Sequence, residues 1–401
     1  MFFLFIPIFF PSTYCFIVIV YDKKSTIMTI IVEEERHLKD ILKQIVLDPK
    51  CLTPAHVVGG IRSIVRGEAS DAQIGGFLIA LKLRRIDSDP EMVAAMAQET
   101  LRGAIVPDIG LDGKPREEIG MIVDIVGTGG DGWNTFNIST TSSLIAAATG
   151  LTVAKHGSRA FSSNCGSADL LEGMGCNLSA ILPVHVARFL KEYRYCFILA
   201  NNFHPSMHYV KMMCNELAFP TPFKVLGPMI NPVVPHRAVI GVNSKTLGPV
   251  MAEALRIMGR RNYAVVCGDE NLDEISIAGD THVWHIQESG EIKSYTIHPR
   301  DFGVPAHPLS EAAGATLEDN KATLHRLVSN VLEERDIAVR DFVLINTGFL
   351  LYVAGTASSM EEGATITRQT LESGKVKMLL ENFAKASYTI TCMCESSQPP
   401  S

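Results

Sequence analysis

The sequence predicts an α/β protein, with a small amino-terminal helical domain and a large domain built on a mostly parallel central sheet flanked by helices. Between residues 33 and 105 the apolar residues repeat with helical spacing, and from Met121 onward short apolar segments of β type alternate with helical segments. The expected strands are 122–126, 151–155, 195–200, 238–242 and 263–267. At 401 residues and 47% hydrophobic content, the chain is long enough for a large core and two domains.

Residues 1–30 form an apolar extension that we do not expect to belong to the fold. Residues 1–21 carry no charged side chain, and their length would allow a membrane span. Pro7 and Pro11 interrupt this segment, no Lys or Arg precedes it, and no small-residue cleavage site is evident. We expect translation to start at Met28, so membrane association is not expected unless residues 1–21 are real; a membrane-anchored form is the alternative.

The helical domain is expected over residues 31–118. Its first helix has one apolar face, made of Leu38, Ile41, Leu42 and Ile45. Thr53-Pro54 and Asp89-Pro90 each combine a capping residue with proline at the first helical position, so each marks the start of a helix. Apolar faces on such short helices fit either a core or an interface between subunits.

A glycine cluster, Gly127 to Gly132, follows the first expected strand, and the hydroxyl residues Ser139 and Thr140 then open a helix. Glycines let backbone N–H groups approach an anion closely, and the unpaired N–H groups at a helix start attract negative charge. The segment therefore predicts a phosphate-binding loop.

A dinucleotide site is the alternative at this loop, because Gly127, Gly129 and Gly132 also satisfy the GxGxxG pattern. Such a site needs an Asp or Glu about 20 residues later, at the end of the next strand. That strand ends instead in the cationic run Lys155-His156-Gly157-Ser158-Arg159. A cation at this place suits a phosphate or pyrophosphate better than a ribose diol.

A turn with four carboxylates follows the strand at 263–267 and ends in the adjacent Asp273 and Glu274. Mg²⁺ binds proteins through one or two carboxylates while substrate phosphate oxygens supply other ligands. An acidic turn alone is more often a solvated loop, but next to a phosphate loop a metal–pyrophosphate site is the better interpretation. Because the glycine loop, Lys155, His204 and this turn all lie at the ends of expected strands, we expect one edge of the sheet to gather them.

Seven motifs follow one another along the chain: GTGGDG (127–132), NIST (137–140), KHGSR (155–159), GSAD (166–169), HPSM (204–207), LGPMINP (226–232) and LDE (272–274). In this order and spacing they resemble the anthranilate phosphoribosyltransferase family, of which the chain looks like a fungal-like or divergent member, from about Leu38 to Ala386. The resemblance implies a nucleoside phosphorylase-like phosphoribosyltransferase fold, with the α/β domain over 119–390. It also implies a homodimer, formed through the helical domain and helices near 206–235.

The reaction implied by the resemblance is transfer of the phosphoribosyl group of phosphoribosyl pyrophosphate (PRPP) to the amino group of anthranilate, in tryptophan biosynthesis. An aromatic amine is already neutral at pH 7, so we assign no general acid or base. Catalysis would depend on positioning and on stabilising the pyrophosphate leaving group, with Mg²⁺, two per subunit, as the implied cofactor.

Motif matches imply three groups of site residues. Those that would bind PRPP are Gly127, Thr128, Gly129, Gly130, Asp131, Thr135, Asn137, Ser139, Thr140, Lys155 and Ser163. Those that would bind the metal are Ser139, Asp273 and Glu274. Those that would bind the acceptor are Gly127, His156, Ser158, His204, Pro205, Cys214, Lys224 and Pro228.

Three of these positions depart from the family pattern. Ser158 stands in place of an Asn that contacts both substrates, Cys214 in place of an acceptor-binding Arg, and Lys224 in place of an Asn. Loss of a charged hydrogen-bond partner costs about 1.5–3 kcal/mol of binding. Lys224 or Lys211 could stand in for the Arg, but an ammonium group offers a carboxylate no planar fork.

Two alternatives to the anthranilate enzyme therefore stay open. One is a paralogue that ribosylates another aromatic amine, and the other is a non-enzymic homologue that binds nucleic acid. A net charge of −7 gives no electrostatic footprint for nucleic acid, and a nucleic-acid-binding protein would gain from losing the carboxylates of Asp273 and Glu274. No nucleic-acid partner is expected.

The remaining features fit an ordinary enzyme of a reducing compartment, and we expect the cytoplasm. Nine cysteines are scattered, with only Cys392 and Cys394 close together, so neither a zinc ribbon nor a disulfide framework is indicated. Late helices are expected over 317–334, 341–353 and 361–386, followed by a disordered tail over 391–401.

Overall fold

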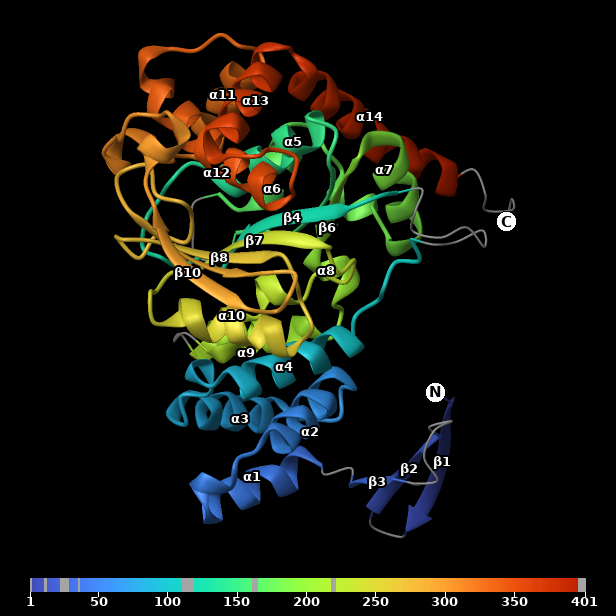
Figure 1. Ribbon diagram of the computed structural model, residues 1–401. Coiled ribbons are helices and arrows are strands. Elements are labelled where there is room, and N and C mark those ends of the chain that lie inside the picture. Colours follow the sequence, from blue (N-terminus) through green and yellow to red (C-terminus); the bar gives the residue numbers. More distant parts are fainter. Residues whose placement is uncertain are drawn as a thin grey trace.

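The computed structural model describes residues 2–10, 13–21, 29–34, 37–109, 119–160, 165–217 and 221–395. A bundle of helices leads into an α/β domain, as the sequence predicts (Figure 1). The helices of the bundle are α1 Leu38–Leu47, α2 Pro54–Val65, α3 Asp71–Leu83 and α4 Pro90–Arg102. Helix α9, Met207–Leu217, packs against α2 and α3, although it lies more than a hundred residues further along the chain.

The two expected helix starts are confirmed. The Thr53 hydroxyl accepts a hydrogen bond from the His56 N–H, while His56 Nδ1 accepts one from the Thr53 N–H. Asp89 caps α4 by accepting from the N–H groups of Glu91 and Met92. Of the expected apolar face of α1, Leu38, Ile41 and Ile45 are buried and Leu42 is half-buried.

The central sheet has seven strands in the order β10-β9-β8-β7-β4-β5-β6. Strands β8 to β6 in this order pair in parallel, which confirms the mostly parallel sheet. The strands are β4 Ile122–Gly127, β5 Thr152–Gly157, β6 Tyr195–Leu199, β7 Arg237–Gly241, β8 Tyr263–Gly268, β9 Thr281–Ile286 and β10 Ile292–Ile297. The antiparallel strands β9 and β10 are absent from the sequence-based prediction, which ended the sheet at β8.

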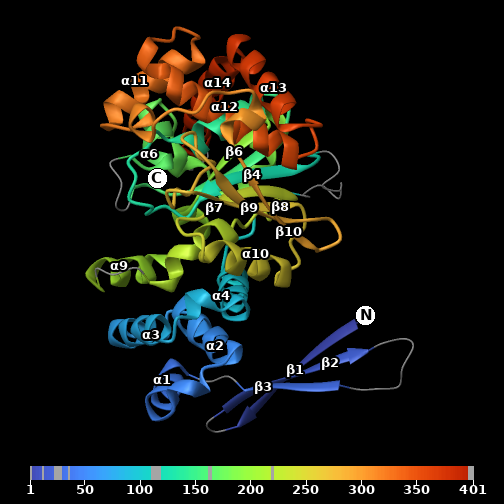
Figure 2. The same cartoon turned by 60° about the vertical axis from the view of Figure 1, so that its left-hand side comes forward.

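Helices cover both faces of the sheet (Figures 1 and 2). Alternate strand residues point to opposite sides, so that Ile125 and Val239 join the core under α5 and α12, while Val126 and Ile240 join the core shared with the helical bundle. The remaining helices of the α/β domain are α5 Ile138–Ala148, α6 Ser167–Gly173, α7 Val186–Tyr193, α8 Ala200–Phe203, α10 Leu247–Ile257, α11 Leu317–Val328, α12 Ile337–Val353, α13 Met360–Glu372 and α14 Lys375–Glu395.

The predicted late helices need three corrections. Helix α11 ends at Val328, six residues early, because Asn330 adopts a left-handed conformation with a φ of 53°. The segment 361–386 is two helices, since Gly374 breaks it with a φ of +74°. Helix α14 then continues to Glu395, so residues 391–395, which we assigned to the tail, are helical; residues 396–401 lie outside the described residues.

The amino-terminal extension contains strands of its own. The segments β1 Phe2–Phe10, β2 Thr13–Tyr21 and β3 Thr29–Glu34 pair antiparallel in a separate three-stranded sheet. Figure 2 shows this sheet outside the layers that surround the seven-stranded sheet. None of the helices in the described part of the chain is long and apolar enough to span a membrane.

Candidate active site

The ends of three strands bring the chemically reactive segments together. The glycine loop follows β4, Lys155 lies within β5, and the acidic turn follows β8. The N–H of Gly129 donates a hydrogen bond of 2.5 Å to Asp273 Oδ2 across 144 residues of sequence. Lys155 interacts electrostatically with Asp273 and Glu274. The expected meeting of these segments at one edge of the sheet is therefore confirmed.

The glycine loop has a conformation that depends on glycine. Gly129, Gly130 and Gly132 have φ values of +69°, +70° and +85°, a region that residues with a Cβ rarely adopt. The Asn243 side-chain amide donates to the carbonyl oxygens of Gly129 and Gly130, at 3.0 and 3.1 Å. The Asn243 side chain thus fixes the direction of the Gly129 and Gly130 carbonyl groups.

Two paired glycines form a slot for Asp273. Gly127 ends β4 and Gly241 ends β7, and the parallel register places them opposite each other. A Cβ at Gly127 would overlap the Asp273 carboxylate, and a Cβ at Gly241 would overlap the Asp273 carbonyl oxygen. The absence of both side chains therefore lets the acidic turn lie directly on the strand ends.

The Asp273 side chain is buried and that of Glu274 is half-buried, and both carboxylates are short of positive charge. Burial, with a further contribution from the neighbouring Asp131, raises the pKa of Asp273 to about 7. Burial and the adjacent Asp273 raise the pKa of Glu274 well above its usual value, although Lys155 and the Ser139 N–H oppose this shift. A divalent cation would relieve this excess of negative charge.

The residues present fit Mg²⁺ that is bound together with a substrate. Among the described residues no cluster of three or more His, Cys, Asp or Glu side chains could hold a metal ion alone. The adjacent carboxylates of Asp273 and Glu274 are nevertheless the protein share of a typical Mg²⁺ site, in which water and phosphate oxygens complete the coordination. The turn therefore suits a metal that arrives with a phosphorylated ligand.

Lys155 is fully buried between carboxylates on two sides. Its largest attraction is to Asp124, in the middle of β4, followed by Glu274 and Asp273. Burial outweighs the Lys155 charge at Asp124 and raises the pKa of this carboxyl to about 6. The Asn231 side chain donates to Asp124 Oδ2 at 2.9 Å. Asp124 was not among the predicted site residues, although a charged residue within the apolar segment of β4 was a usable signal. Asn231 lies in the LGPMINP motif, but its bond to Asp124 was not predicted.

The start of α5 buries hydroxyl groups next to the glycine loop. The side-chain oxygens of Thr128 and Thr140 have no hydrogen-bond partner among the described residues. Buried hydroxyls without a partner are unfavourable, so a ligand or water that bonds them is expected. The neighbouring Thr135 forms an isolated bridge with Ala313, and the Asn137 amide donates to the Cys165 carbonyl oxygen at 3.2 Å. Of the predicted PRPP residues, only Ser163 lies outside the described residues.

The two histidines of the predicted acceptor group, His156 and His204, are buried and lie next to each other. Their ring centroids are 5.5 Å apart at an interplanar angle of 62°. His156 Nδ1 lies 3.1 Å from the Gly227 carbonyl oxygen, and His204 Nε2 lies 2.9 Å from the Ile230 carbonyl oxygen, so each of these nitrogens must carry the proton. Burial lowers the pKa of His156 to about 3 and that of His204 to about 4.

The remaining ring nitrogens, His156 Nε2 and His204 Nδ1, are buried and have no hydrogen-bond partner among the described residues. Because both rings are neutral at pH 7, these two nitrogens are hydrogen-bond acceptors. They suit a ligand that donates, such as an amine.

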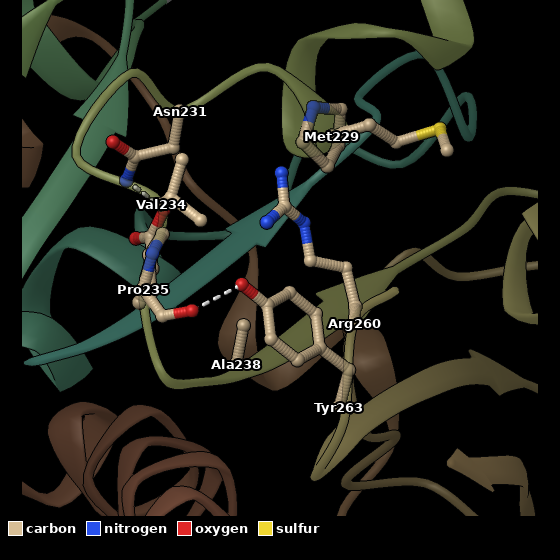
Figure 3. A pocket seen from close by; sticks show the side chains of 9 residues that line it. Met229, Asn231, Val234, Pro235, Ala238, Arg260 and Tyr263 are labelled. Atoms are coloured by element: carbon tan, nitrogen blue, oxygen red, sulfur yellow. Dashed lines mark hydrogen bonds between the residues drawn. The ribbon is translucent and has the colours of Figure 1, made fainter. Parts of the chain in front are cut away.

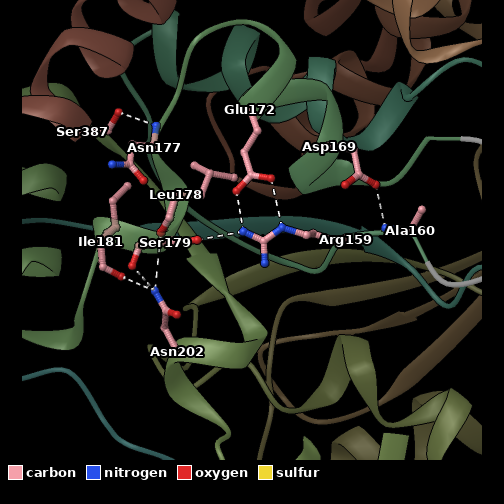
Figure 4. Close-up of polar contacts among 10 residues, drawn as sticks. All are labelled: Arg159, Ala160, Asp169, Glu172, Asn177, Leu178, Ser179, Ile181, Asn202 and Ser387. Carbon is pink, nitrogen blue, oxygen red and sulfur yellow. Dashed lines mark hydrogen bonds and ion pairs between the residues drawn. The ribbon is translucent and has the colours of Figure 1, made fainter. Parts of the chain in front are cut away.

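A polar network holds the segment after β5, as Figure 4 shows. Arg159 donates to both carboxylate oxygens of Glu172, at 3.0 and 2.6 Å, and to the Ser179 hydroxyl at 2.8 Å. Asn202, in α8, donates to the carbonyl oxygens of Ser179 and Ile181. The network therefore connects the chain around the exposed Ser158 to the helix that leads into His204 and the exposed Pro205.

Of the three positions that depart from the family pattern, Ser158 follows β5, Cys214 lies in α9 and Lys224 lies in the short 3₁₀ helix Pro222–Val225. The Cys214 thiol and the Thr221 hydroxyl are 3.1 Å apart, and burial raises the pKa of this thiol. The Lys224 ammonium group lies against Gly130, where it would collide with any Cβ. Lys224 is thus next to the glycine loop, a position that sequence reasoning did not anticipate.

A small cavity lies on the Asp124 side of this region (Figure 3). The Tyr263 hydroxyl donates to the Pro235 carbonyl oxygen at 2.6 Å, and the Arg260 side chain points into the cavity. The cavity is lined by Asp124, Pro228, Met229, Asn231, Val234, Pro235, Ala238, Arg260 and Tyr263. The predicted acceptor residue Pro228 therefore packs against the supports of the buried Asp124.

Comparison with known proteins agrees with this geometry. Residues 120–377 match the model of the glycosyl transferase family a/b domain, and residues 39–102 match that of the glycosyl transferase family helical bundle domain. The chain is 39% identical over 328 residues to anthranilate phosphoribosyltransferase of Schizosaccharomyces pombe, covering 82% of this chain and 90% of that protein. It is 37% identical over 324 residues to that of Neisseria meningitidis, covering 80% and 88%.

Solved structures show the same fold. The crystal structure of anthranilate phosphoribosyltransferase from Thermus thermophilus superposes with a TM-score of 0.76 at 35% identity, covering 86% of this chain and 98% of that chain. The Saccharomyces cerevisiae enzyme in complex with PRPP and Mg superposes with a TM-score of 0.78 at 30% identity, covering 88% and 98%. The same yeast enzyme has also been solved with 4-fluoroanthranilate. The chain thus belongs to the anthranilate phosphoribosyltransferase family of glycosyltransferases.

Proposed function

We propose that the chain transfers the phosphoribosyl group of PRPP to the amino group of anthranilate, giving N-(5-phosphoribosyl)anthranilate and pyrophosphate in tryptophan biosynthesis. The observation that carries this proposal is the contact between the glycine loop and the buried acidic turn, through the bond from Gly129 to Asp273. A phosphate-binding loop joined to a carboxylate pair suits a pyrophosphate ester and its cation better than a dinucleotide.

In this proposal the donor is held by the glycine loop, the start of α5 and Lys155. The unpaired Thr128 and Thr140 hydroxyls donate to phosphate oxygens, and the Lys155 ammonium offsets their charge. Asp273, Glu274 and the Ser139 hydroxyl would hold Mg²⁺, for which we propose two ions per subunit. When bound, Mg²⁺ would neutralise the charge that develops on the pyrophosphate leaving group.

The acceptor is held beside the two neutral histidines. His156 Nε2 and His204 Nδ1 accept hydrogen bonds and so orient the amine with its lone pair toward C1 of the ribose. The C1–O bond to pyrophosphate breaks, its electron pair leaves with the pyrophosphate, and the C1–N bond forms. The nitrogen then loses its surplus proton to the released pyrophosphate or to water. Since the attacking amine is neutral, no strong base is needed to start the reaction.

An assay of pyrophosphate release tests the proposal. With PRPP, Mg²⁺ and anthranilate, we expect release of pyrophosphate together with formation of N-(5-phosphoribosyl)anthranilate, and chelation of Mg²⁺ should stop both. Release only with other aromatic amines would show that the acceptor is not anthranilate. Transfer to another aromatic amine is the second candidate function, because Ser158 and Cys214 replace residues that bind the acceptor in the family pattern. Absence of pyrophosphate release with every amine tested would contradict both candidate functions.

We expect Cys214→Arg to lower the KM for anthranilate by about tenfold and to leave the KM for PRPP nearly unchanged. A guanidinium at this place in α9 would add a bidentate partner for the acceptor carboxylate, a gain of about 1.5–3 kcal/mol. Steady-state kinetics with each substrate varied would measure both constants. Cys214→Lys is the matched control, because it adds charge without the planar fork. An unchanged KM for anthranilate would show that this helix does not bind the carboxylate.

We also propose a homodimer that forms through the helical bundle. Helices α1, α3 and α9 carry exposed apolar side chains, with Leu47 85% and Leu83 78% exposed. Apolar side chains gathered on neighbouring helices mark an interaction surface. Sedimentation should give a molecular mass twice that of the chain. Leu83→Glu should lower the measured mass toward that of a single chain, whereas the control Ile257→Glu on α10 should leave it unchanged. A monomeric parent protein would contradict this assignment.

For localisation we propose the cytoplasm. Six cysteines are free thiols, namely Cys51, Cys165, Cys176, Cys196, Cys214 and Cys267, which fits a reducing compartment. Fractionation of cells that express the chain should recover it with cytoplasmic enzymes. Recovery in membranes would instead favour the membrane-anchored form.

A further inference from the structure

The acidic turn is held from behind by a side chain that belongs to no motif. Directly after Glu274, the N–H of Ile275 donates to Asn346 Oδ1 at 3.0 Å, and Asn346 Nδ2 donates back to the Ile275 carbonyl oxygen at 3.1 Å. Asn346 lies in the middle of α12 and is completely buried, as is Ile275. The carboxamide therefore pairs with both backbone groups of one residue of the turn, its N–H and its carbonyl oxygen, as a neighbouring strand would.

Both amide hydrogens of Asn346 are used in hydrogen bonds, and its side-chain oxygen accepts one. Its second amide hydrogen goes to the Phe342 carbonyl oxygen, one turn earlier in the same helix, at 3.0 Å. Asn is a poor residue for a helix interior, and a buried carboxamide is unfavourable unless it is bonded. A Leu at this place would suit α12 by itself better, so the benefit of Asn346 lies in the turn that it holds.

The position of this bond matters for the chemistry. The next side-chain bond to the turn, from the Ser276 N–H to the Thr281 hydroxyl at 2.8 Å, lies one residue further from the carboxylates. On the opposite side, Gly127 and Gly241 form the slot that receives Asp273. The segment that carries both carboxylates is thus fixed between the strand ends and α12.

We propose that Asn346 is a positioning residue that sets the direction of the Asp273 and Glu274 carboxylates for Mg²⁺ and PRPP. It acts through the Ile275 peptide and touches no substrate. The inference rests on the proposed function only in the identity of the ligands, because the bonds between Asn346 and Ile275 join residues of the chain itself.

The test replaces Asn346 and measures how PRPP binding depends on Mg²⁺. For Asn346→Leu, calorimetric titration with PRPP at a series of Mg²⁺ concentrations should show the half-saturating Mg²⁺ concentration raised by about tenfold, the effect of losing one good hydrogen bond at the site. Asn346→Ser is the second variant, since a helical Ser hydroxyl bonds the carbonyl one turn earlier and leaves Ile275 unpaired. It should show the same shift if Asn346→Leu does not fold.

Two controls on the same helix separate positioning from stability. Thr347 is equally buried, and its hydroxyl has no partner among the described residues, so Thr347→Val should change neither stability nor Mg²⁺ dependence. Leu351→Ala should lower the Tm by leaving a cavity, while the half-saturating Mg²⁺ concentration stays at the parent value.

Hydrogen exchange of the Ile275 amide in the ligand-free protein gives an independent reading. Exchange should be at least tenfold faster in either Asn346 variant and unchanged in Thr347→Val. If the Asn346 variants had a parent-like Mg²⁺ dependence and a lower Tm, as Leu351→Ala should have a lower Tm, the inference would be overturned while the proposed function would stand. If the parent chain bound no PRPP at any Mg²⁺ concentration, the proposed function would be overturned and the inference with it.

Discussion

Replacing Asp273 by Asn and Glu274 by Gln in one chain is expected to lower kcat/KM for PRPP by about a thousandfold or more at saturating Mg²⁺. The two side chains keep their shapes but lose the negative charge that would hold the metal at the pyrophosphate. Steady-state rates of pyrophosphate release measure the effect. Asp269→Asn is the control, because Asp269 belongs to the same turn but is half exposed and pairs with Lys245 and His282.

The stability of this double variant should move in the opposite direction from its activity. Burial raises the pKa of Asp273 from 3.8 to about 7 and that of Glu274 in the same sense, so the folded state disfavours both charges. The folded state therefore favours the protonated form of Asp273. The stability that this form contributes to the parent protein is fully present below pH 3.8 and is lost as the pH rises through about 7. Above that pH the neutral variant avoids this loss.

At pH 8 the variant should therefore have a Tm equal to or above that of the parent, and the difference should shrink toward pH 5. Thermal unfolding of both proteins across this range gives the comparison. Parent-like activity would contradict the metal assignment, and a large fall in Tm at pH 8 would show that the carboxylates support the fold itself.

The local parts of the site could be predicted from the sequence because each follows a strand of the parallel sheet. The glycine loop, Lys155 and the Asp273 turn are recognisable from residue type and from the apolar segment before each one. Strands that run in parallel end at the same edge, so their meeting follows from topology alone. This reasoning correctly placed the glycine loop, Lys155 and the Asp273 turn next to one another.

The supports of the site could not be predicted in this way, because they depend on contacts between distant segments. Asn231 bonds Asp124 across 107 residues, and Asn346 bonds Ile275 across 71 residues. Asn231 belongs to the LGPMINP motif, but its neighbours in sequence do not indicate its bonding partner, and Asn346 belongs to none of the motifs. The Lys224 contact with Gly130 is of the same kind, since it depends on how the chain returns after α9.

Errors in the secondary structure also have local physical causes. Strands β9 and β10 extend the sheet by antiparallel pairing, and β10 exposes several polar residues, so its sequence lacks the apolar run of a central strand. The break between α13 and α14 was missed because the apolar pattern continues on both sides of Gly374. Only the left-handed conformation of this glycine separates the two helices.

The second large effect is expected from Gly241→Ala, a change of one methyl group outside every recognised motif. The added Cβ would overlap the Asp273 backbone carbonyl oxygen, and a backbone atom cannot rotate away as a side chain can. The turn would have to move by a sizeable fraction of an ångström or more. Displacement of about 1 Å at a catalytic centre costs about a hundredfold in rate, and overpacking of this kind destabilises by about 1–3 kcal/mol.

Kinetics and thermal unfolding of Gly241→Ala should thus show a hundredfold lower kcat/KM for PRPP and a raised Mg²⁺ requirement. The matched control is Gly75→Ala in α3, where an added Cβ meets nothing within 4 Å and Ala favours the helix. That variant should keep parent activity and be at least as stable. A parent-like Gly241→Ala would mean that the turn does not need to lie on the strand ends. The close contact between β7 and Asp273 would then have no part in holding the carboxylates.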